Sequence, residues 1–154
     1  MKVVKFGGSS LASATQLEKV FNIVKEDEAR QYVVVSAPGK RNAEDTKVTD
    51  ALIKYYKEYT NGKDTNQSQE WIINRYRSIT EELDLDEEII EEISRDIKSL
   101  ATLPKSDNTF LYDTFLAAGE NNNAKLIAAY FVKKGLDAKY IHPKNAGIFV
   151  TSEP

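Results

Sequence analysis

The residues with the clearest potential for chemistry lie near the N-terminus, in the run Val3-Val4-Lys5-Phe6-Gly7-Gly8-Ser9-Ser10-Leu11. A lysine at the end of a buried strand costs free energy unless its ammonium group meets an anion. The two glycines after it leave the backbone open to close approach, and the amides of residues 7–10 can form an anion nest ahead of a helix. The run therefore predicts a phosphate-binding loop. It is not a Walker A loop, because the lysine precedes the glycines. By itself, Gly-Gly after a strand is more often only a tight turn, and this alternative stays open.

The elements around this loop must present it at the edge of a sheet. Apolar residues before the loop predict a strand, and residues 17–24 carry apolar side chains at helical spacing, with Ser13 and Gln16 in the form of a capping box. The β-branched run at 32–35, closed by Ala37-Pro38-Gly39, predicts a second strand that is buried on both faces of a parallel sheet. This βαβ unit places the carboxyl ends of both strands at the same edge.

The rest of the chain predicts mainly helices. Apolar periodicity indicates a helix over 48–60 and a helical hairpin at about 62–104, whose two arms carry stripes at 71–83 and 89–100. A further long helix leads to Gly135 and is either continuous or broken near Gly119. Short strands are expected at 139–141 and 147–150. The fold class is therefore α/β, with a thin sheet of three or four strands.

Composition excludes several functional classes. The chain has 154 residues and a net charge of −3, which disfavours nucleic-acid and membrane partners. It has no cysteine and one histidine, which argues against disulfides, thiolate catalysis and zinc sites. The absence of cysteine also favours a cytoplasmic protein. The acidic run at 81–92 alternates with isoleucine and leucine in helical phase, so we interpret it as a solvated helix face and predict no metal site.

Several segments together resemble the aspartokinase family. Lys5-Phe6-Gly7-Gly8-Ser9-Ser10 fits the family signature, and further matching segments follow in family order at 34–37, 48–50, 119–126 and 143–151. The resemblance covers essentially the whole chain. It implies the amino-acid kinase fold, a three-layer sandwich with a mostly parallel central sheet, in which residues 1–154 form the N-terminal portion of the catalytic domain. The nucleotide lobe and the regulatory ACT domains are not among these residues, so we expect this chain alone to be inactive.

The resemblance also implies an activity, which is transfer of the γ-phosphoryl group of MgATP to the β-carboxylate of L-aspartate. The product, 4-phospho-L-aspartate, begins the route to lysine, threonine and methionine. A carboxylate nucleophile is already ionised at neutral pH, so the reaction needs no general base, and the single histidine of this chain is no obstacle. The full-length enzyme is expected to be a homo-oligomer.

Individual roles carry over by the same resemblance. Lys5 is expected to neutralise the transferring phosphoryl group, and the amides of Gly7, Gly8 and Ser9 to bind ATP phosphates. Thr49 and Glu120 are expected to bind aspartate, Glu120 through the α-ammonium group. From the residues alone, Thr49 could instead only cap its helix, and Glu120 could be a surface residue after a glycine kink.

Two alternative functions remain. One is another amino-acid kinase, acting on glutamate, acetylglutamate, carbamate or uridylate, whose relatives share the Lys-x-Gly-Gly start. The other is a non-catalytic phosphate-binding or assembly module.

Overall fold

The computed structural model describes residues 1–148 and begins with the expected βαβ unit. Strands β1 (Lys2–Phe6) and β2 (Arg30–Val35) form a two-stranded parallel sheet, joined by the short 3-10 helix η1 (Gly8–Leu11) and helix α1 (Ala14–Lys25). Ser13 caps α1 by accepting a hydrogen bond from the Gln16 amide, which confirms the predicted start of this helix.

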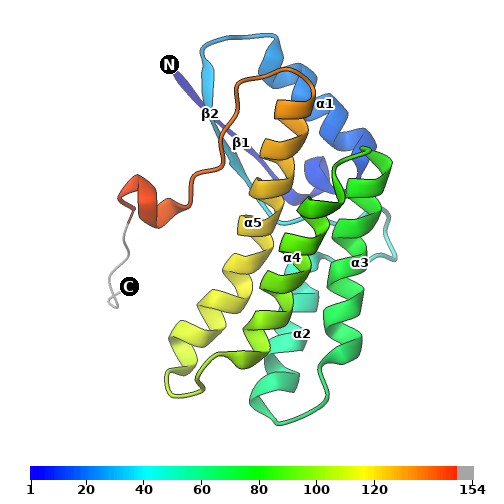
Figure 1. Ribbon diagram of the computed structural model, residues 1–154, viewed down its shortest axis with the longest axis vertical. Coiled ribbons are helices and arrows are strands. Elements are labelled where there is room, and N and C mark those ends of the chain that lie inside the picture. The colour runs from blue at the N-terminus through cyan, green and yellow to red at the C-terminus, as the bar shows by residue number, and fades with distance from the viewer. Residues whose placement is uncertain (149–154) are drawn as a thin grey trace.

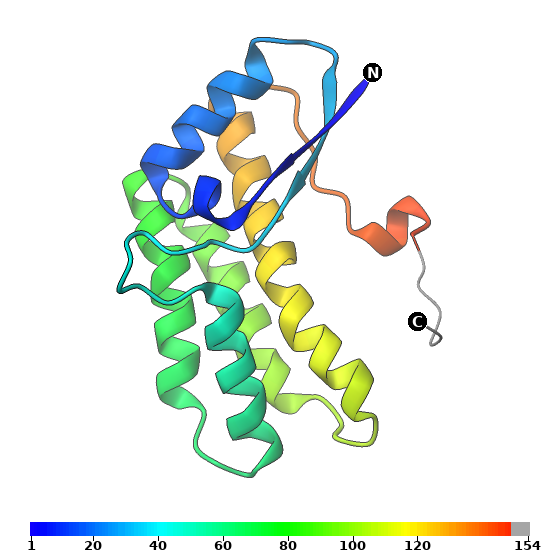
Figure 2. The same ribbon diagram turned by 180° about the vertical axis from the view of Figure 1, so that it is seen from behind.

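Four longer helices form a bundle that extends away from one end of the sheet (Figures 1 and 2). They are α2 (Val48–Thr60), α3 (Asn66–Glu82), α4 (Glu87–Ser99) and α5 (Asn108–Lys133), with short 3-10 turns η2 (Leu100–Thr102) and η3 (Pro143–Ala146). Helices α3 and α4 pack as the predicted hairpin. In α4, Ile90, Ile93 and Ile97 are buried and the glutamates are exposed, which confirms the amphipathic interpretation of the acidic run.

Helix α5 is continuous through Gly119, so the predicted alternative of a break there is wrong. Glycine at this position serves close packing instead, because a Cβ atom on Gly119 would lie 2.8 Å from Cβ of Ala37 and 3.1 Å from Cδ1 of Leu52. The absence of a side chain lets α5 lie directly against the segment after β2 and against α2.

The sheet is buried on one face only, which corrects the expectation that β2 is covered on both. Val4, Phe6, Val33 and Val35 pack against the core, and the alternate residues Val3, Tyr32 and Val34 are 66%, 53% and 49% exposed. The continuous β-branched run predicted the strand correctly. Its burial depends on whether a second layer lies above it, and no helix of residues 1–148 occupies that side (Figures 1 and 2).

The predicted strand at 139–141 is wrong, because these residues are an irregular segment after α5. Ile141 is 54% exposed, and β1 and β2 pair only with each other, so the segment gains neither ladder hydrogen bonds nor burial. Of the predicted strand at 147–150, Gly147 has a left-handed φ of 80° and ends η3, and residues 149–150 lie outside the described part. None of the helices in residues 1–148 is long and apolar enough to span a membrane.

Candidate active site

The segment Ser36–Gly39, immediately after β2, joins the three regions that carry the predicted site residues. The Ser36 amide donates to the carbonyl of Phe6 (3.2 Å), and the Gly39 amide donates to the carbonyl of Gly8 (2.8 Å). The carbonyl of Pro38 accepts from the amide of Val48 at the start of α2 (3.1 Å). We call residues 36–39 the β2 loop. It positions residues 7–10, which we call the glycine run, on one side and the first turn of α2 on the other.

The glycine run and the β2 loop touch backbone to backbone. A Cβ atom on Gly39 would lie 2.5 Å from the carbonyl carbon of Gly8 and 2.7 Å from the amide nitrogen of Ser9. Gly39 must therefore be glycine in this arrangement. Gly7 differs, because a Cβ atom there would meet nothing within 4 Å. Open space beside Gly7 leaves its backbone accessible to a ligand.

Lys5 lies in β1 opposite Val34 and is exposed to solvent. The argument that a buried ammonium group must meet an anion therefore does not hold for this chain, since Lys5 lies on a strand at the open side of the sheet. The anion nest is also smaller than predicted, because the amide of Ser10 donates to the carbonyl of Gly7 (3.0 Å) within the 3-10 turn.

Thr49 occupies the first turn of α2 and is half-buried. It does not cap this helix, because the N-cap position belongs to Lys47, where no side-chain hydrogen bond is formed. Next to it, Val48 is fully buried and its amide is held by Pro38. The Thr49 hydroxyl thus stands on a fixed backbone, at a helix end that favours anions.

Glu120 is exposed, and its place on α5 is anchored by the residues around it. The Tyr76 hydroxyl donates to the carbonyl of Gly119 (2.7 Å), and the Asn123 side-chain amide donates to the carbonyl of Ser36 (2.7 Å). Tyr76 and Asn123 are both fully buried. Burial raises the pKa of Tyr76 above its usual range, and the Glu120 carboxylate raises it further. Glu120 therefore projects from a rigid helix rather than from a kink.

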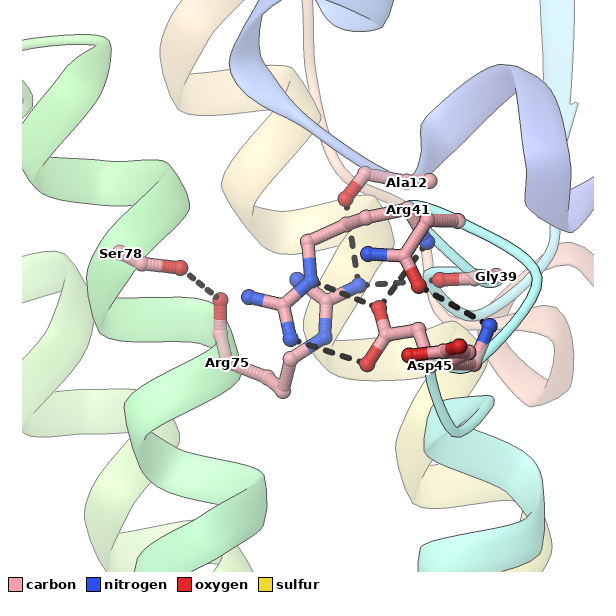
Figure 3. A network of polar contacts seen from close by, with 8 residues as sticks. Ala12, Gly39, Arg41, Asp45, Arg75 and Ser78 are labelled. Atoms are coloured by element: carbon pink, nitrogen blue, oxygen red, sulfur yellow. Dashed lines mark hydrogen bonds and ion pairs between the residues drawn. The ribbon is translucent and has the colours of Figure 1, made fainter.

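Several of these supporting residues were missed by sequence reasoning, and Arg75 is the clearest case. It lies among the buried apolar residues of α3, is 3% exposed, and donates from Nη2 to the carbonyls of Ala12 (3.1 Å) and Gly39 (3.0 Å) (Figure 3). A charged residue within an apolar helical stripe is the signal that could have identified it.

A second cation lies beside Arg75 in the same network. Arg41 makes a two-point ion pair with Asp45, with Nε to Oδ2 at 2.6 Å and Nη2 to Oδ1 at 2.9 Å (Figure 3). This pairing holds the pKa of the Asp45 carboxyl well below its usual range. Asp45 therefore remains ionised next to the loops and partly balances the two guanidinium groups.

The structure brings the glycine run, Thr49 and Glu120 together around the β2 loop as an open wall rather than as an enclosed pocket. A surface hollow of about 700 Å³ lies elsewhere, near the C-terminal end of α2, and its lining residues include none of the predicted site residues. We place the candidate site at the β2 loop, because the backbone contacts converge there. In residues 1–148, no group of three or more acidic or histidine side chains is gathered in a way that could hold a metal ion.

Comparison with known proteins defines the class of this chain. Residues 1–153 match the amino acid kinase family, and the chain belongs to that family. Within it, the chain is 54% identical over 154 residues to aspartokinase 3 of Bacillus subtilis (strain 168), which is all of this chain and 34% of that protein. The chain thus spans about a third of the length of the curated relative that it matches.

Solved structures give the same result. The aspartate kinase of Clostridium acetobutylicum superposes with a TM-score of 0.70 at 33% identity, covering 84% of this chain and 29% of that one. Aspartokinase III of E. coli, in complex with aspartate and ADP, superposes with a TM-score of 0.63 at 23% identity, covering 90% and 30%. The resemblance to aspartokinases and the expected amino-acid kinase fold are confirmed, and the described residues supply part of that fold.

Proposed function

We propose that this chain supplies the phosphate loop and one wall of the aspartate site in an aspartokinase. The reaction transfers the γ-phosphoryl group of MgATP to the β-carboxylate of L-aspartate. The main support is the β2 loop, whose backbone contacts join the Lys5–Ser9 run to the elements that carry Thr49 and Glu120. The 54% identity to an aspartokinase favours this reaction over those of other amino-acid kinases.

In this proposal the residues act by position and charge. Lys5 offsets the negative charge that develops on the transferring oxygens, and the amides of Gly7, Gly8 and Ser9 bind ATP phosphates. The Thr49 hydroxyl binds aspartate, and the Glu120 carboxylate binds its α-ammonium group. No residue has to remove a proton, because the β-carboxylate is ionised at neutral pH.

The remaining partners are part of the same proposal. Magnesium enters with the nucleotide phosphates, as is usual for this ion, and residues 1–148 offer no acidic cluster of their own to hold it. Residues 1–154 serve as the N-terminal portion of the catalytic domain in a cytoplasmic homo-oligomer. That enzyme makes 4-phospho-L-aspartate for lysine, threonine and methionine synthesis.

The test is an assay of the full-length gene product with ATP, Mg²⁺ and L-aspartate, in which aspartyl phosphate is trapped as the hydroxamate. We expect turnover with aspartate and none with glutamate, acetylglutamate, carbamate or uridylate. Turnover with one of those acceptors would assign another amino-acid kinase. Binding of ATP without turnover on any acceptor would support a non-catalytic module.

Residues 1–154 alone are a useful second sample in the same assay. In-line transfer requires groups on both sides of the phosphoryl group, and the described residues form a single open wall. We therefore expect no measurable turnover from this polypeptide. Turnover comparable to an intact aspartokinase would mean that these residues contain the whole catalytic apparatus.

A further inference from the structure

Arg75 makes few hydrogen bonds for a guanidinium group that is 97% buried. Its Nη2 atom donates to two carbonyls, and its Nε and Nη1 atoms are buried without an acceptor among residues 1–148. Buried unpaired donors cost stability, and apolar residues of similar size often replace buried charges at no loss. Arg75 is therefore poorly explained as a stabilising core residue. Departures of this kind from good packing are typical of functional sites.

The two carbonyls that Arg75 contacts come from the two loops of the candidate site. Ala12 follows the 3-10 turn that contains Gly8 and Ser9, and Gly39 belongs to the β2 loop that contacts Gly8 directly. The Nη2 atom of Arg75 thus links Ala12, just after the 3-10 turn, to Gly39 in the β2 loop (Figure 3). These contacts cross 63 and 36 residues of sequence, so they tie together segments that are distant along the chain.

We propose that Arg75 is a positioning residue for ATP, which holds the glycine run against the β2 loop so that the amides of residues 7–9 keep their places. This inference rests on the proposed kinase function. Arg75 is buried and acts through Ala12 and Gly39 rather than by contact with the nucleotide. Its charge adds to the positive field at the loop, and Asp45 of the adjacent Arg41–Asp45 ion pair partly balances that charge. The α3–α4 hairpin then contributes to nucleotide binding as well as to the scaffold.

Substitution of Arg75 should change the kinetic constants for ATP more than those for aspartate. Thr49 follows the fully buried side chain of Val48, and Glu120 follows Gly119, whose carbonyl accepts from Tyr76; neither support passes through Ala12 or Gly39. A displacement of about 1 Å in a positioning element can cost roughly 10²-fold in rate. We expect Arg75→Met to lower kcat/KM for ATP at least about 10-fold. KM for aspartate should stay within about 2-fold, because the displaced amides of residues 7–9 bind ATP phosphates and not aspartate.

The experiment uses the full-length gene product with four substitutions. Arg75→Met removes the two donated hydrogen bonds, and Arg75→Lys keeps the charge without the planar fork. Arg77→Met is the matched control on the same helix, where Arg77 donates to Asn74. Ile93→Ala is a control for lost stability, since Ile93 is fully buried in α4 away from the loops. Each variant is measured for kcat, both KM values, the unfolding midpoint and amide hydrogen exchange.

The expected result is a selective ATP defect in Arg75→Met, a smaller one in Arg75→Lys, and wild-type kinetics in Arg77→Met. Ile93→Ala should lower the unfolding midpoint and leave KM for ATP unchanged. If Arg75→Met does not fold, Arg75→Lys decides alone, and wild-type ATP kinetics in it would overturn the proposal. Equal effects of Arg75→Met on both substrates, or effects that follow only the lost stability as in Ile93→Ala, would overturn it as well.

Hydrogen exchange separates this inference from the proposed function. If the wild-type protein turns over no substrate, the kinase proposal fails, but the amides of residues 8–12 and 39 still report on the loop. Faster exchange at these amides in Arg75→Met than in Arg77→Met would support the positioning role. Unchanged exchange would refute it, whatever the activity.

Discussion

Substitution of Gly39 by alanine tests the contact between the glycine run and the β2 loop. The added Cβ atom would lie 2.5 Å from the carbonyl carbon of Gly8, 2.7 Å from its oxygen and 2.7 Å from the amide nitrogen of Ser9. All three are backbone atoms, so no side-chain rotation can relieve the overlap. Ordinary contact begins at 3.4 Å, and the two loops must therefore separate by about 1 Å.

Two consequences follow from this separation. Overpacking of this kind costs about 1–3 kcal/mol, and alanine recovers about 0.4–1 kcal/mol by restricting the unfolded chain. Strain in the hydrogen bond from the Gly39 amide to the carbonyl of Gly8 adds up to about 1 kcal/mol. We therefore expect Gly39→Ala to lose about 2 kcal/mol of unfolding free energy. Displacement of the loop by about 1 Å should lower kcat/KM for ATP by roughly 10²-fold.

The assay is denaturant unfolding together with steady-state kinetics of the full-length gene product. Gly7→Ala serves as the matched control for stability, because its Cβ atom would meet nothing within 4 Å. It should remain within about 0.5 kcal/mol of the wild type in unfolding free energy. If Gly39→Ala unfolds at the same denaturant concentration as Gly7→Ala and keeps wild-type kinetics, the loops do not pack as closely as described.

Other predictions concern the remaining site residues and the acidic helix. Lys5→Ala should lower kcat roughly 10²- to 10³-fold with little change in KM for aspartate, and equal changes in both would argue against its role. Thr49→Val and Glu120→Ala should raise KM for aspartate; an unchanged aspartate saturation curve would place the pocket elsewhere. Tyr76→Phe removes the hydrogen bond to the carbonyl that precedes Glu120, so it should cost about 1–2 kcal/mol in unfolding free energy and raise KM for aspartate. A normal KM in that variant would show that α5 is held without this bond. Glu88 lies on the exposed face of α4, so Glu88→Lys should change the unfolding free energy by only about 0.5 kcal/mol. The Mg²⁺ dependence of turnover should be unaffected. Altered metal dependence would reveal an acidic metal site.

Local patterns in the sequence were enough to predict most of the elements. Residues 17–24 and 48–60 form helices where apolar side chains recur at helical spacing, and Ser13 caps the first of these helices. The run from Lys5 to Ser10 indicated the family, because it fits the aspartokinase signature, and with the family it indicated the phosphate loop. These features depend on neighbours within a few residues, which sequence periodicity records directly.

The tertiary structure alone decided which segments meet and which faces are buried. The Asn123 side chain binds the carbonyl of Ser36 across 87 residues, and Arg75 joins two loops from a third element. Glycine at 119 lowers helix propensity by about 1 kcal/mol, so the sequence allowed a break, but packing against Ala37 keeps α5 continuous. In the same way, the exposure of Lys5 and Val34 depends on whether another segment covers their face of the sheet. Hydrophobic periodicity shows that a face can be buried, but only contacts between distant segments determine whether it is, since burial requires a partner surface.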